Sequence, residues 1–292
     1  MTKNHLVFIV NPKSGTQNQK ETRQAIETCL DSSKFTWEIQ NTEYRNHGTI
    51  LAKKAADNGA YGVVAVGGDG SINDIVQGLI GTDTLMAIIP KGSGNGLART
   101  LEIPLTTTEA VNVINTGKII PMDVGLANGR PFVSNAGVAF DALISKKFSD
   151  SSVRGIIGYA WLVTSHIWTY QSWVWDIIID GEQLREKAFM VNVANGQQFG
   201  YNFYIAPGAS CQDGMLDVVV IRQFPKIFGG TLAYRGLTGT LTKSPFVRHY
   251  KGKEIIINNP KLKLMQADGD ARICESTVTF KVAPFKQRMI VP

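Results

Sequence analysis

The sequence predicts two domains: an N-terminal α/β domain with a mostly parallel sheet, followed by an antiparallel β-sandwich. Over residues 6–122, short apolar strands alternate with longer helix-like stretches, which is the pattern of right-handed βαβ crossovers. From about residue 123, strand-like runs follow one another with turn signals between them, which favours antiparallel pairing. A chain of 292 residues is long enough for two domains of ordinary size.

The first domain is expected to contain buried parallel strands. Runs such as LVFIV, GVVAV and LMAII are short and apolar, as strands covered on both faces are. Between them lie stretches with polar faces, one of which ends at Asn58-Gly59, a usual helix stop. The expected strands are 6–10, 35–42, 62–66 and 85–89, and the expected helices are 17–31, 46–58, 72–80, one starting near Leu97, and 107–115.

The second domain is expected to be antiparallel because turn signals separate its apolar runs. Asp180-Gly181 lies between two of these runs and predicts a tight hairpin. The expected strands are 121–127, 130–138, 174–180, 185–194, 215–222, 253–258, 262–268 and 276–283.

A helical stretch over 154–173 interrupts the second domain and carries Trp161, Trp168 and Trp173. It is too polar for a transmembrane span, which needs about 20 mostly apolar residues. One interpretation is a helix that covers an end of the sandwich, with its tryptophans in the core. The other is an apolar wall for a lipid tail or a surface that faces a membrane, where tryptophans are common.

Three glycine-rich turns each follow an apolar strand of the first domain. Loops at the carboxyl ends of such strands share one crevice, glycine lets the backbone approach a ligand, and a following helix adds a positive dipole end. The turns therefore predict a polyphosphate site. No P-loop motif occurs, and no dinucleotide fingerprint follows the first strand, which argues against both of those classes. The turns are Asn11-Pro12-Lys13-Ser14-Gly15, Gly67-Gly68-Asp69-Gly70-Ser71 and Lys91-Gly92-Ser93-Gly94-Asn95-Gly96.

The order of the motifs resembles the diacylglycerol kinase catalytic family. N-P-K-S-G, G-G-D-G-S, G-S-G-N-G-x-A-R and a late D-G-D follow one another as in bacterial lipid kinases and sphingosine kinases, to which NAD kinases are related. The resemblance runs from about residue 5 to the C-terminus. It implies a three-layer α/β nucleotide-binding domain over 1–122, a β-sandwich lipid-substrate domain over 123–283, and a C-terminal segment at about 284–292 that returns to the first domain.

The resemblance also implies which residues hold the nucleotide. Lys13 would neutralise phosphate charge, and Arg45, in a sphingosine-kinase-like T-E-x-R-N-H segment, would reach a phosphate with its guanidinium. A solvated loop lysine is the alternative for Lys13, and ordinary turn chemistry is the alternative for Ser93 and Asn95. The implied set is Asn11, Lys13, Ser14, Gly15, Thr42, Arg45, Gly67, Gly68, Gly70, Ser71, Gly92, Ser93, Gly94 and Asn95.

Three acids are implied to carry the catalysis. Asp69 would sit by the transferred phosphoryl group and act on the acceptor hydroxyl or on a metal-bound water, and the alternative is a helix N-cap. Asp268 and Asp270 would join it in binding Mg²⁺, a hard cation that takes oxygen ligands. The chain departs from the family at two points: Asp270 replaces a longer Glu, and Gly96 stands where many members have Asp.

A second metal site is implied by the turn at 212–217, which resembles the family's D-D-G-x-L-D. In bacterial members the aspartate at the position of Asp213 helps to hold a structural Mg²⁺ with backbone carbonyls, which here would be those of Ser210 and Met215. A plain hairpin turn is an equal alternative, because Asp-Gly is the commonest signal for one. Gln212 stands where an acid is frequent, which weakens the metal interpretation.

Composition indicates the cellular compartment and the kinds of partner that the protein is expected to have. The chain has 43% hydrophobic and 18% charged residues, as globular proteins do, and three scattered cysteines that favour reduced thiols in the cytoplasm. The polar start indicates no signal peptide. A net charge of +6 fits an ordinary basic surface or contact with anionic lipid headgroups, and no basic run interleaved with aromatics indicates nucleic acid.

Together these features predict an ATP-dependent lipid kinase that transfers the γ-phosphoryl group to a lipid hydroxyl, that of diacylglycerol, a sphingoid base or a related lipid. Its cofactors would be ATP and Mg²⁺. The protein would be cytoplasmic and peripherally attached to the membrane that presents its lipid, with no nucleic-acid partner and with a homodimer left open. The alternatives are an NAD kinase-like enzyme and a catalytically inactive nucleotide- or lipid-binding regulator.

Overall fold

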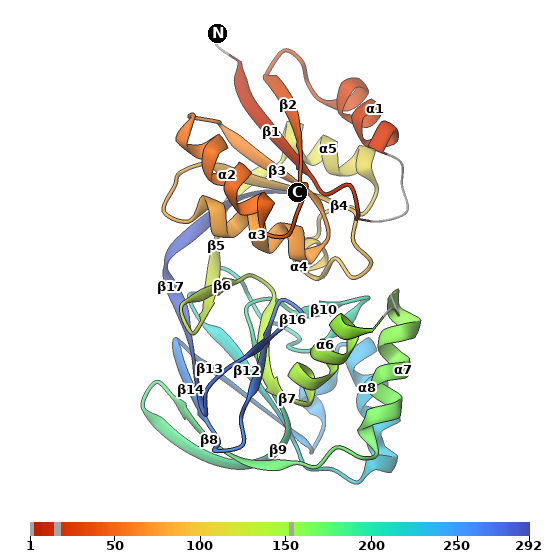
Figure 1. The fold of residues 1–292 in the computed structure, drawn as a ribbon, viewed down its shortest axis with the longest axis vertical. Coiled ribbons are helices and arrows are strands. Elements are labelled where there is room, and N and C mark those ends of the chain that lie inside the picture. Colours follow the sequence, from red (N-terminus) through yellow and green to blue (C-terminus); the bar gives the residue numbers. More distant parts are fainter. Residues whose placement is uncertain (1–2, 15–18, 152–154) are drawn as a thin grey trace. The chain divides into compact units, whose positions relative to one another are not determined.

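The computed structural model describes residues 3–14, 19–151 and 155–292, and the chain divides into two compact units (Figure 1). Unit 1 consists of Met1–Met122 with Phe285–Pro292, and unit 2 consists of Asp123–Pro284. Two strands belong to both units: β5 (Lys118–Ala127) leaves unit 1, and β17 (Thr277–Val291) returns to it.

A parallel sheet in the order β17-β4-β3-β1-β2 forms the middle of unit 1. β1 pairs with β2 and β3, β3 pairs with β4, and β17 joins β4 where Met289 lies beside Met86. Every residue of β3 and β4 is buried, because helices cover both faces of the sheet. The first four strands are β1 (Asn4–Val10), β2 (Phe35–Asn41), β3 (Gly62–Gly67) and β4 (Leu85–Pro90).

The helices of unit 1 form two layers. α2 packs on α3 and α1 packs on α5, and Figure 1 shows the two pairs on opposite faces of the sheet, so the predicted three-layer α/β arrangement is confirmed. The chain goes from β1 to β2 through α1 and then back past β1 to β3 through α2, so its direction across the sheet reverses at β1. Ligands of open α/β sheets bind outside the carboxyl ends of the strands at such a reversal. The helices are α1 (Gln19–Cys29), α2 (His47–Asp57), α3 (Asp69–Leu79), α4 (Gly96–Thr100) and α5 (Thr107–Thr116).

Antiparallel pairs build unit 2, as predicted. The sheet order runs β16-β15-β7-β9-β8-β14-β17, and β12 pairs with both β9 and β13. The apolar core of this β domain includes the fully buried side chains of Phe132, Trp175 and Phe280. The strands are β6 (Arg130–Phe132), β7 (Asn135–Ala139), β8 (Trp173–Ile179), β9 (Glu182–Ala194), β12 (Leu216–Arg222), β13 (Val247–Gly252), β14 (Glu254–Asn258), β15 (Leu264–Ala267) and β16 (Asp270–Ile273).

The hairpin expected at Asp180-Gly181 is confirmed. Ile179 pairs with Glu182, so the loop has two residues, and both have positive φ angles, 48° and 91°. This is the geometry of a type I′ turn, which the right-handed twist of the two strands favours. The Asp180 carboxylate also accepts the backbone N–H groups of Lys253 and Glu254 and ties the hairpin to β14.

Some strands of unit 2 were not predicted or lie differently. The run expected at 130–138 is split into β6 and β7, because Val133 and Ser134 between them donate their N–H groups to Asp268. β13 and β16 lie at edges of the sheet; β13 exposes half of its residues and β16 has no buried residue, so neither carries an apolar alternation. A separate two-stranded ribbon, β10 (Gln198–Gly200) with β11 (Phe203–Tyr204), is too short for a periodic signal.

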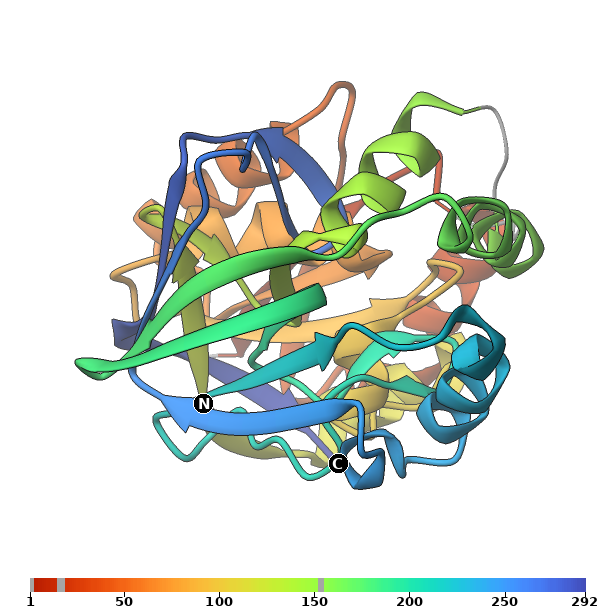
Figure 2. The same ribbon diagram turned by 90° about the horizontal axis from the view of Figure 1, so that it is seen from below.

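Three helices lie on one side of unit 2 (Figure 2). α7 (Gly155–Ile167) occupies the stretch predicted at 154–173 but ends earlier, and Trp173 starts β8 instead; residue 154 is outside the described residues. α6 (Phe140–Asp150) and α8 (Gly229–Leu237) were not predicted, and they cover a second apolar cluster that includes Phe189. Two single 3₁₀ turns flank α8, η1 (Lys226–Phe228) and η2 (Leu241–Lys243).

None of the helices in the described part of the chain has both the length and the apolar character needed to cross a bilayer.

Candidate active site

The three glycine-rich turns meet at the carboxyl edge of the unit 1 sheet. The Asn11 N–H donates to the Val66 carbonyl at 3.1 Å, and the Asn11 Nδ2 donates to the Ser71 hydroxyl at 3.2 Å. The Lys91 N–H donates to the Gly67 carbonyl at 2.8 Å. The first turn is thus bonded to the second and the second to the third, as the strand order predicts.

Glycine is required where the second and third turns touch. A Cβ on Gly92 would lie 2.5 Å from the Cα of Gly68, and a Cβ on Gly68 would lie 3.0 Å from the Cα of Gly92. Real Cβ atoms essentially never come as close as the first distance, and the second is tighter than nearly all real contacts, so a side chain at Gly92 would push the two turns apart. Gly70, by contrast, faces open space.

The start of α3 offers an anion site between these turns. The first N–H groups of a helix have no partner inside it, and the N-cap residue Gly68 has no side chain that could accept them. α3 has 11 residues, so its positive dipole end adds to these donors. A phosphate group is the natural ligand of such a helix terminus.

Asp69 is the first residue of α3, but its side chain reaches the start of α4. Its Oδ1 accepts the Leu97 N–H at 3.3 Å, and the Asp69 carboxyl also takes backbone hydrogen bonds from Asn95 and Gly96. The alternative of an N-cap for α3 is wrong, because Gly68 is that N-cap. Burial raises the pKa of Asp69 above its ordinary value, although these N–H groups act in the other direction. A raised pKa makes this carboxylate a better proton acceptor.

The side chain of Asn95 closes its own turn, which is the alternative role that the sequence left open for it. Its Oδ1 accepts the Gly92 N–H at 2.9 Å and its Nδ2 donates to the Gly92 carbonyl at 2.8 Å, so the side chain closes the third turn. Asn95 is buried and has a left-handed backbone with a φ of 50°. Ser93 is exposed, and the Gly94 carbonyl accepts Arg99 Nε.

The remaining nucleotide residues surround the end of β1. The Lys13 N–H donates to Asn11 Oδ1 at 3.0 Å, while the Lys13 side chain is exposed. Thr42 follows β2, and its N–H donates to the Val10 carbonyl at 2.9 Å, which brings it beside the first turn. Arg45 is exposed in the loop before α2. Gly15 is outside the described residues.

Asp268 holds the backbone of unit 2 together. Its Oδ2 accepts the Val133 N–H at 2.8 Å, and its Oδ1 accepts the N–H groups of Ser134 and Asn135 at 2.8 and 3.1 Å. Asp270 forms an ion pair with Arg272 at 2.8 Å. These two acids belong to unit 2, whereas Asp69 belongs to unit 1.

At the turn over 212–217, where the resemblance implies a structural metal, a lysine side chain contacts Asp213. Lys251 Nζ lies 2.7 Å from Asp213 Oδ2 and 3.7 Å from the Oδ2 of the buried Asp217. The hydrogen bond to Asp213 is the main reason that the pKa of Lys251 is raised. Asp217 also bonds His249 at 2.6 Å. An ammonium group therefore already supplies the positive charge at this turn. In the parts of the chain that the structure describes, no three His, Cys, Asp or Glu side chains are grouped to hold a metal ion.

A buried polar cluster in unit 2 was missed by the sequence analysis. Asp141, in the first turn of α6, accepts Gln266 Nε2 at 2.7 Å and Asn192 Nδ2 at 3.0 Å through its Oδ2. Burial raises the pKa of Asp141 to about 6. It also raises the pKa of Tyr159, on α7 nearby, and the charge of Asp141 adds to that rise. An acid inside an apolar strand-to-helix junction, V-A-F-D-A, was the available signal.

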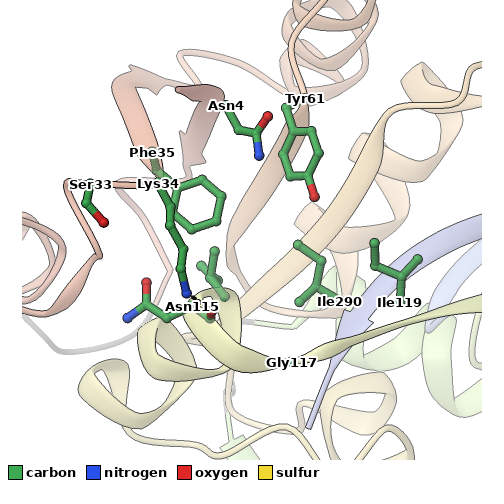
Figure 3. Close-up of a pocket in the computed structure, with 10 residues that line it drawn as sticks. Asn4, Ser33, Lys34, Phe35, Tyr61, Asn115, Gly117, Ile119 and Ile290 are labelled. Carbon is green, nitrogen blue, oxygen red and sulfur yellow. Dashed lines mark hydrogen bonds between the residues drawn. The ribbon is translucent and has the colours of Figure 1, made fainter. Parts of the chain in front are cut away.

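A hollow of about 360 Å³ lies at the other edge of the unit 1 sheet (Figure 3). It is lined at the amino ends of the strands by Asn4, Phe35 and Tyr61, and the Lys34 side chain extends across it towards Asn115. Lys34 Nζ donates to the Asn115 carbonyl at 3.3 Å. Because the glycine turns are at the carboxyl edge, this hollow is separate from them.

Two family descriptions match nearly the whole chain. Residues 5–127 match the diacylglycerol kinase catalytic domain, and residues 134–291 match the YegS C-terminal NAD kinase β-sandwich-like domain. The chain belongs to the diacylglycerol kinase catalytic family. The resemblance drawn from its motifs is thereby confirmed.

Named relatives share this two-part organisation. The chain is 25% identical to a diacylglycerol kinase of Staphylococcus saprophyticus over 90% of this chain and 88% of that protein. It is 28% identical to a YegS-like lipid kinase of Chromohalobacter salexigens over 75% of this chain and 72% of that protein.

Solved structures agree in fold. A diacylglycerol kinase from Bacillus anthracis superposes with a TM-score of 0.76 at 22% identity, covering 100% of this chain and 98% of that one. An NAD kinase from Archaeoglobus fulgidus in complex with ATP superposes with a TM-score of 0.53 at 14% identity, covering 98% and 93%. At these identities the likeness concerns the fold alone.

Replacing Lys251 by Met tests the role of its ammonium group. We expect the free energy of unfolding to fall by about 1–2 kcal/mol. Solvent screens the partly exposed pair of Lys251 with Asp213, which limits the fall, but the buried Asp217 carboxylate would lose its nearby positive charge. Thermal unfolding measures the loss. If the lysine takes the place of a metal, the shift of melting temperature caused by Mg²⁺ will be the same in the wild type and in Asp213→Asn. A shift that disappears in Asp213→Asn would assign a metal to the turn.

Asp141 should make stability depend on pH. Its pKa is about 6 in the folded protein against an ordinary 3.8, so the folded state binds the extra proton between these values. Its stabilising contribution is complete below pH 3.8 and is lost as the pH rises through 6, by up to about 3 kcal/mol. Asp141→Asn keeps an acceptor oxygen and has no charge to bury. In melting curves between pH 4 and pH 7.5, the melting temperature of the variant should rise relative to that of the wild type as the pH rises. A difference in melting temperature that stays constant over this range would refute the assignment.

Proposed function

We propose that this chain is an ATP-dependent lipid kinase, a phosphotransferase with an alcohol group as acceptor. The observation that carries the proposal is the meeting of three glycine-rich turns at one sheet edge, in a chain whose two halves match the diacylglycerol kinase catalytic domain and the YegS C-terminal domain. The acceptor would be the hydroxyl of diacylglycerol, a sphingoid base or a related lipid. The names of the relatives, diacylglycerol kinase and YegS-like lipid kinase, support this class of substrate.

The nucleotide would bind along the carboxyl edge of unit 1. Its phosphates would take N–H groups from the start of α3 and from the turns at Gly67–Ser71 and Gly92–Asn95. Lys13 and Arg45 are exposed on neighbouring loops and would neutralise phosphate charge. Asn11, Ser14 and Thr42 would line the same end of β1, and Gly15 completes the proposed set. Asn95 would contribute by closing its turn, because both polar ends of its side chain are already bonded to Gly92.

Asp69 would take the proton of the lipid hydroxyl. As the hydroxyl oxygen bonds to the γ-phosphorus, the bond from that phosphorus to the β–γ bridging oxygen breaks and ADP leaves. The pKa of Asp69, raised by burial, suits this proton transfer. Phosphoryl transfer otherwise needs positioning and charge neutralisation more than covalent help.

Mg²⁺ would be the second cofactor, and it would supply charge neutralisation on the β- and γ-phosphates. Asp69, Asp268 and Asp270 are the acids proposed for catalysis and Mg²⁺ binding. Asp268 is better suited to position the backbone than to bind the ion directly, because both of its oxygens already accept backbone N–H groups. At the turn over 212–217, a structural metal would be bound by Asp213 and the carbonyls of Ser210 and Met215. Such an ion would have to displace Lys251, whose ammonium group already pairs with Asp213.

The protein would work in the cytoplasm, where ATP is supplied, and would reach its lipid by peripheral contact with a membrane. A homodimer is one possible active form. Light scattering on the same samples used for the activity assay distinguishes it from a monomer.

Turnover of labelled ATP against a panel of lipids in mixed micelles tests the function. We expect phosphate transfer to at least one of diacylglycerol, sphingosine, ceramide, monoacylglycerol or polyprenol, with loss of activity in excess EDTA and return of activity with Mg²⁺. NAD is the control acceptor, because it separates a lipid kinase from an NAD kinase-like enzyme. Transfer to NAD alone, or nucleotide binding without any transfer, would overturn the proposal.

Two aspartate variants separate chemistry from positioning. Asp69→Asn keeps one acceptor oxygen for the N–H groups at the start of α4 and turns the other into an NH₂ group, so its melting temperature should fall somewhat; the ATP affinity of the folded variant should change little, while its turnover falls by about 100-fold or more. Asp268→Asn loses an acceptor and places an NH₂ group against a backbone N–H, so its melting temperature should fall as well. Full turnover in Asp69→Asn contradicts its role, and an unchanged melting curve in Asp268→Asn contradicts the positioning role.

A further inference from the structure

α7 exposes an apolar stripe. Ile157 and Trp161 are four residues apart and share one side of α7, and Trp168 lies in the turn directly after its last residue, Ile167. Ile157, Trp161 and Trp168 are 83%, 59% and 66% exposed. The opposite side of α7 is buried against the core through Leu162. The interpretation that places the tryptophans in the core is therefore wrong for Trp161 and Trp168, because both side chains are largely exposed.

The segment of η1 and α8 repeats this pattern. Tyr234 and Leu237 are three residues apart on one side of α8, and Ile227 lies in η1 just before that helix; Ile227, Tyr234 and Leu237 are 79%, 67% and 54% exposed. Leu232 is buried on the other side. Gly236 is also buried, where a Cβ would lie 2.3 Å from the ring of Phe203.

The two stripes lie next to each other. A Cβ on Gly229, at the start of α8, would lie 2.8 Å from Ile167 Cδ1, at the end of α7. Leu162 and Leu232 pack on the same apolar cluster, so the exposed sides of both helices point away from one core. Figures 1 and 2 both show α7 and α8 side by side. We call the six exposed side chains the apolar face: Ile157, Trp161, Trp168, Ile227, Tyr234 and Leu237.

The charges of these segments have one sign. Residues 155–175 contain no Asp, Glu, Lys or Arg. Residues 223–250 contain Lys226, Arg235, Lys243 and Arg248 but no Asp or Glu. Single exposed apolar residues are common, but six large ones on adjoining helices mark an interaction site. Its partner must be apolar and must also complement positive charge.

We propose that the apolar face is a membrane-binding surface that inserts into the interfacial region of a bilayer and prefers anionic lipids. Tryptophan and tyrosine favour that region, and aliphatic side chains enter the acyl boundary beneath it. Lysine and arginine beside an interface gain from the negative surface potential of anionic lipids. The proposal deepens the lipid kinase function by naming the surface that meets the bilayer, and it rests on that function for the purpose of the contact.

Flotation with vesicles tests the proposal without nucleotide. The probes are vesicles of phosphatidylcholine alone and of phosphatidylcholine with an equal part of phosphatidylglycerol. The wild type should float with the anionic vesicles and should dissociate at high salt, because 1 M salt shortens the Debye length to about 3 Å. The double variant Ile157→Ser/Ile227→Ser should bind at least about 10-fold more weakly, since each exposed isoleucine contributes buried area in the bilayer.

A matched control lies on unit 1. Ile50→Ser/Lys54→Gln changes an exposed isoleucine and an exposed lysine of α2 and should bind as the wild type does. Lys243→Gln/Arg248→Gln should lose the preference for anionic vesicles and keep the weaker binding to neutral ones. Melting curves of all three variants should match the wild type, because the changed side chains are exposed.

Several outcomes overturn the proposal. Vesicle binding that the isoleucine variant leaves unchanged would place the contact elsewhere. Failure of the wild type to float, with a lower mass in solution for the isoleucine variant, would assign the face to a second copy of the chain. Failure of the wild type to float with its mass unchanged by that variant would also refute membrane binding. Kinase turnover is measured separately, so face-dependent flotation without phosphate transfer would refute the proposed enzyme and leave the membrane surface standing.

Discussion

The approach of two glycine backbones, Gly68 and Gly92, is the constraint on which the nucleotide end of unit 1 depends. Neither residue has a positive φ, so glycine is required here for space and not for an unusual conformation. The contact places the start of α3 beside the third turn, and only this placement lets the Asp69 carboxylate reach the Leu97 N–H. The hydrogen bonds through Asn11 and Lys91 then fix the first turn to the second and the second to the third. A helix terminus without a side-chain cap and the partly buried Asp69 thus lie beside the third turn because no side chain separates the two turns.

Buried and half-buried carboxylates organise unit 2 in a similar way. Asp268 collects backbone N–H groups from three successive residues, which interrupts the strand expected at 130–138 and fixes the hairpin of β15 and β16. Asp141 accepts side-chain amides instead, and burial raises its pKa to about 6 although these hydrogen bonds act in the other direction. Asp213 shares Lys251 with Asp217. Backbone N–H groups, side-chain amides and an ion pair thus offset the cost of burial at Asp268, Asp141 and Asp217 respectively.

Two helices of unit 2, α7 and α8, differ from the helices that cover the sheet of unit 1. α3 buries its apolar side and turns polar residues outward, as helices on a sheet do. α7 and α8 bury one apolar side and expose another, which costs free energy in water unless a second apolar medium covers it. In the proposed function, the acyl boundary of the bilayer that presents the lipid would be that medium. The local excess of cations without acids agrees with the same partner.

The sequence by itself determined the classes of element and the family. Apolar runs ended by glycine-rich turns are sufficient to predict parallel strands, because a strand covered on both faces has no polar alternation. The ordered motifs were sufficient to assign the family, because several short patterns in one order rarely occur by chance. The Asp180-Gly181 turn was predictable for a local reason, since its two backbone conformations suit few residues.

Only the tertiary structure decided what individual side chains do. A pattern of residue types does not say that Asp69 reaches α4 rather than capping α3, that Asn95 uses both ends of its amide within its own turn, or that Lys251 meets Asp213. Apart from the local bonds of Asn95, such partners come from segments distant in sequence: Asp69 and Leu97 are 28 residues apart, and Asp268 and Val133 are 135 apart. The edge strands β13 and β16 and the tryptophan stripe of α7 were undecided for the same reason. Hydrophobic periodicity reports which sides of an element are apolar, whereas packing against the rest of the chain decides which of those sides is covered.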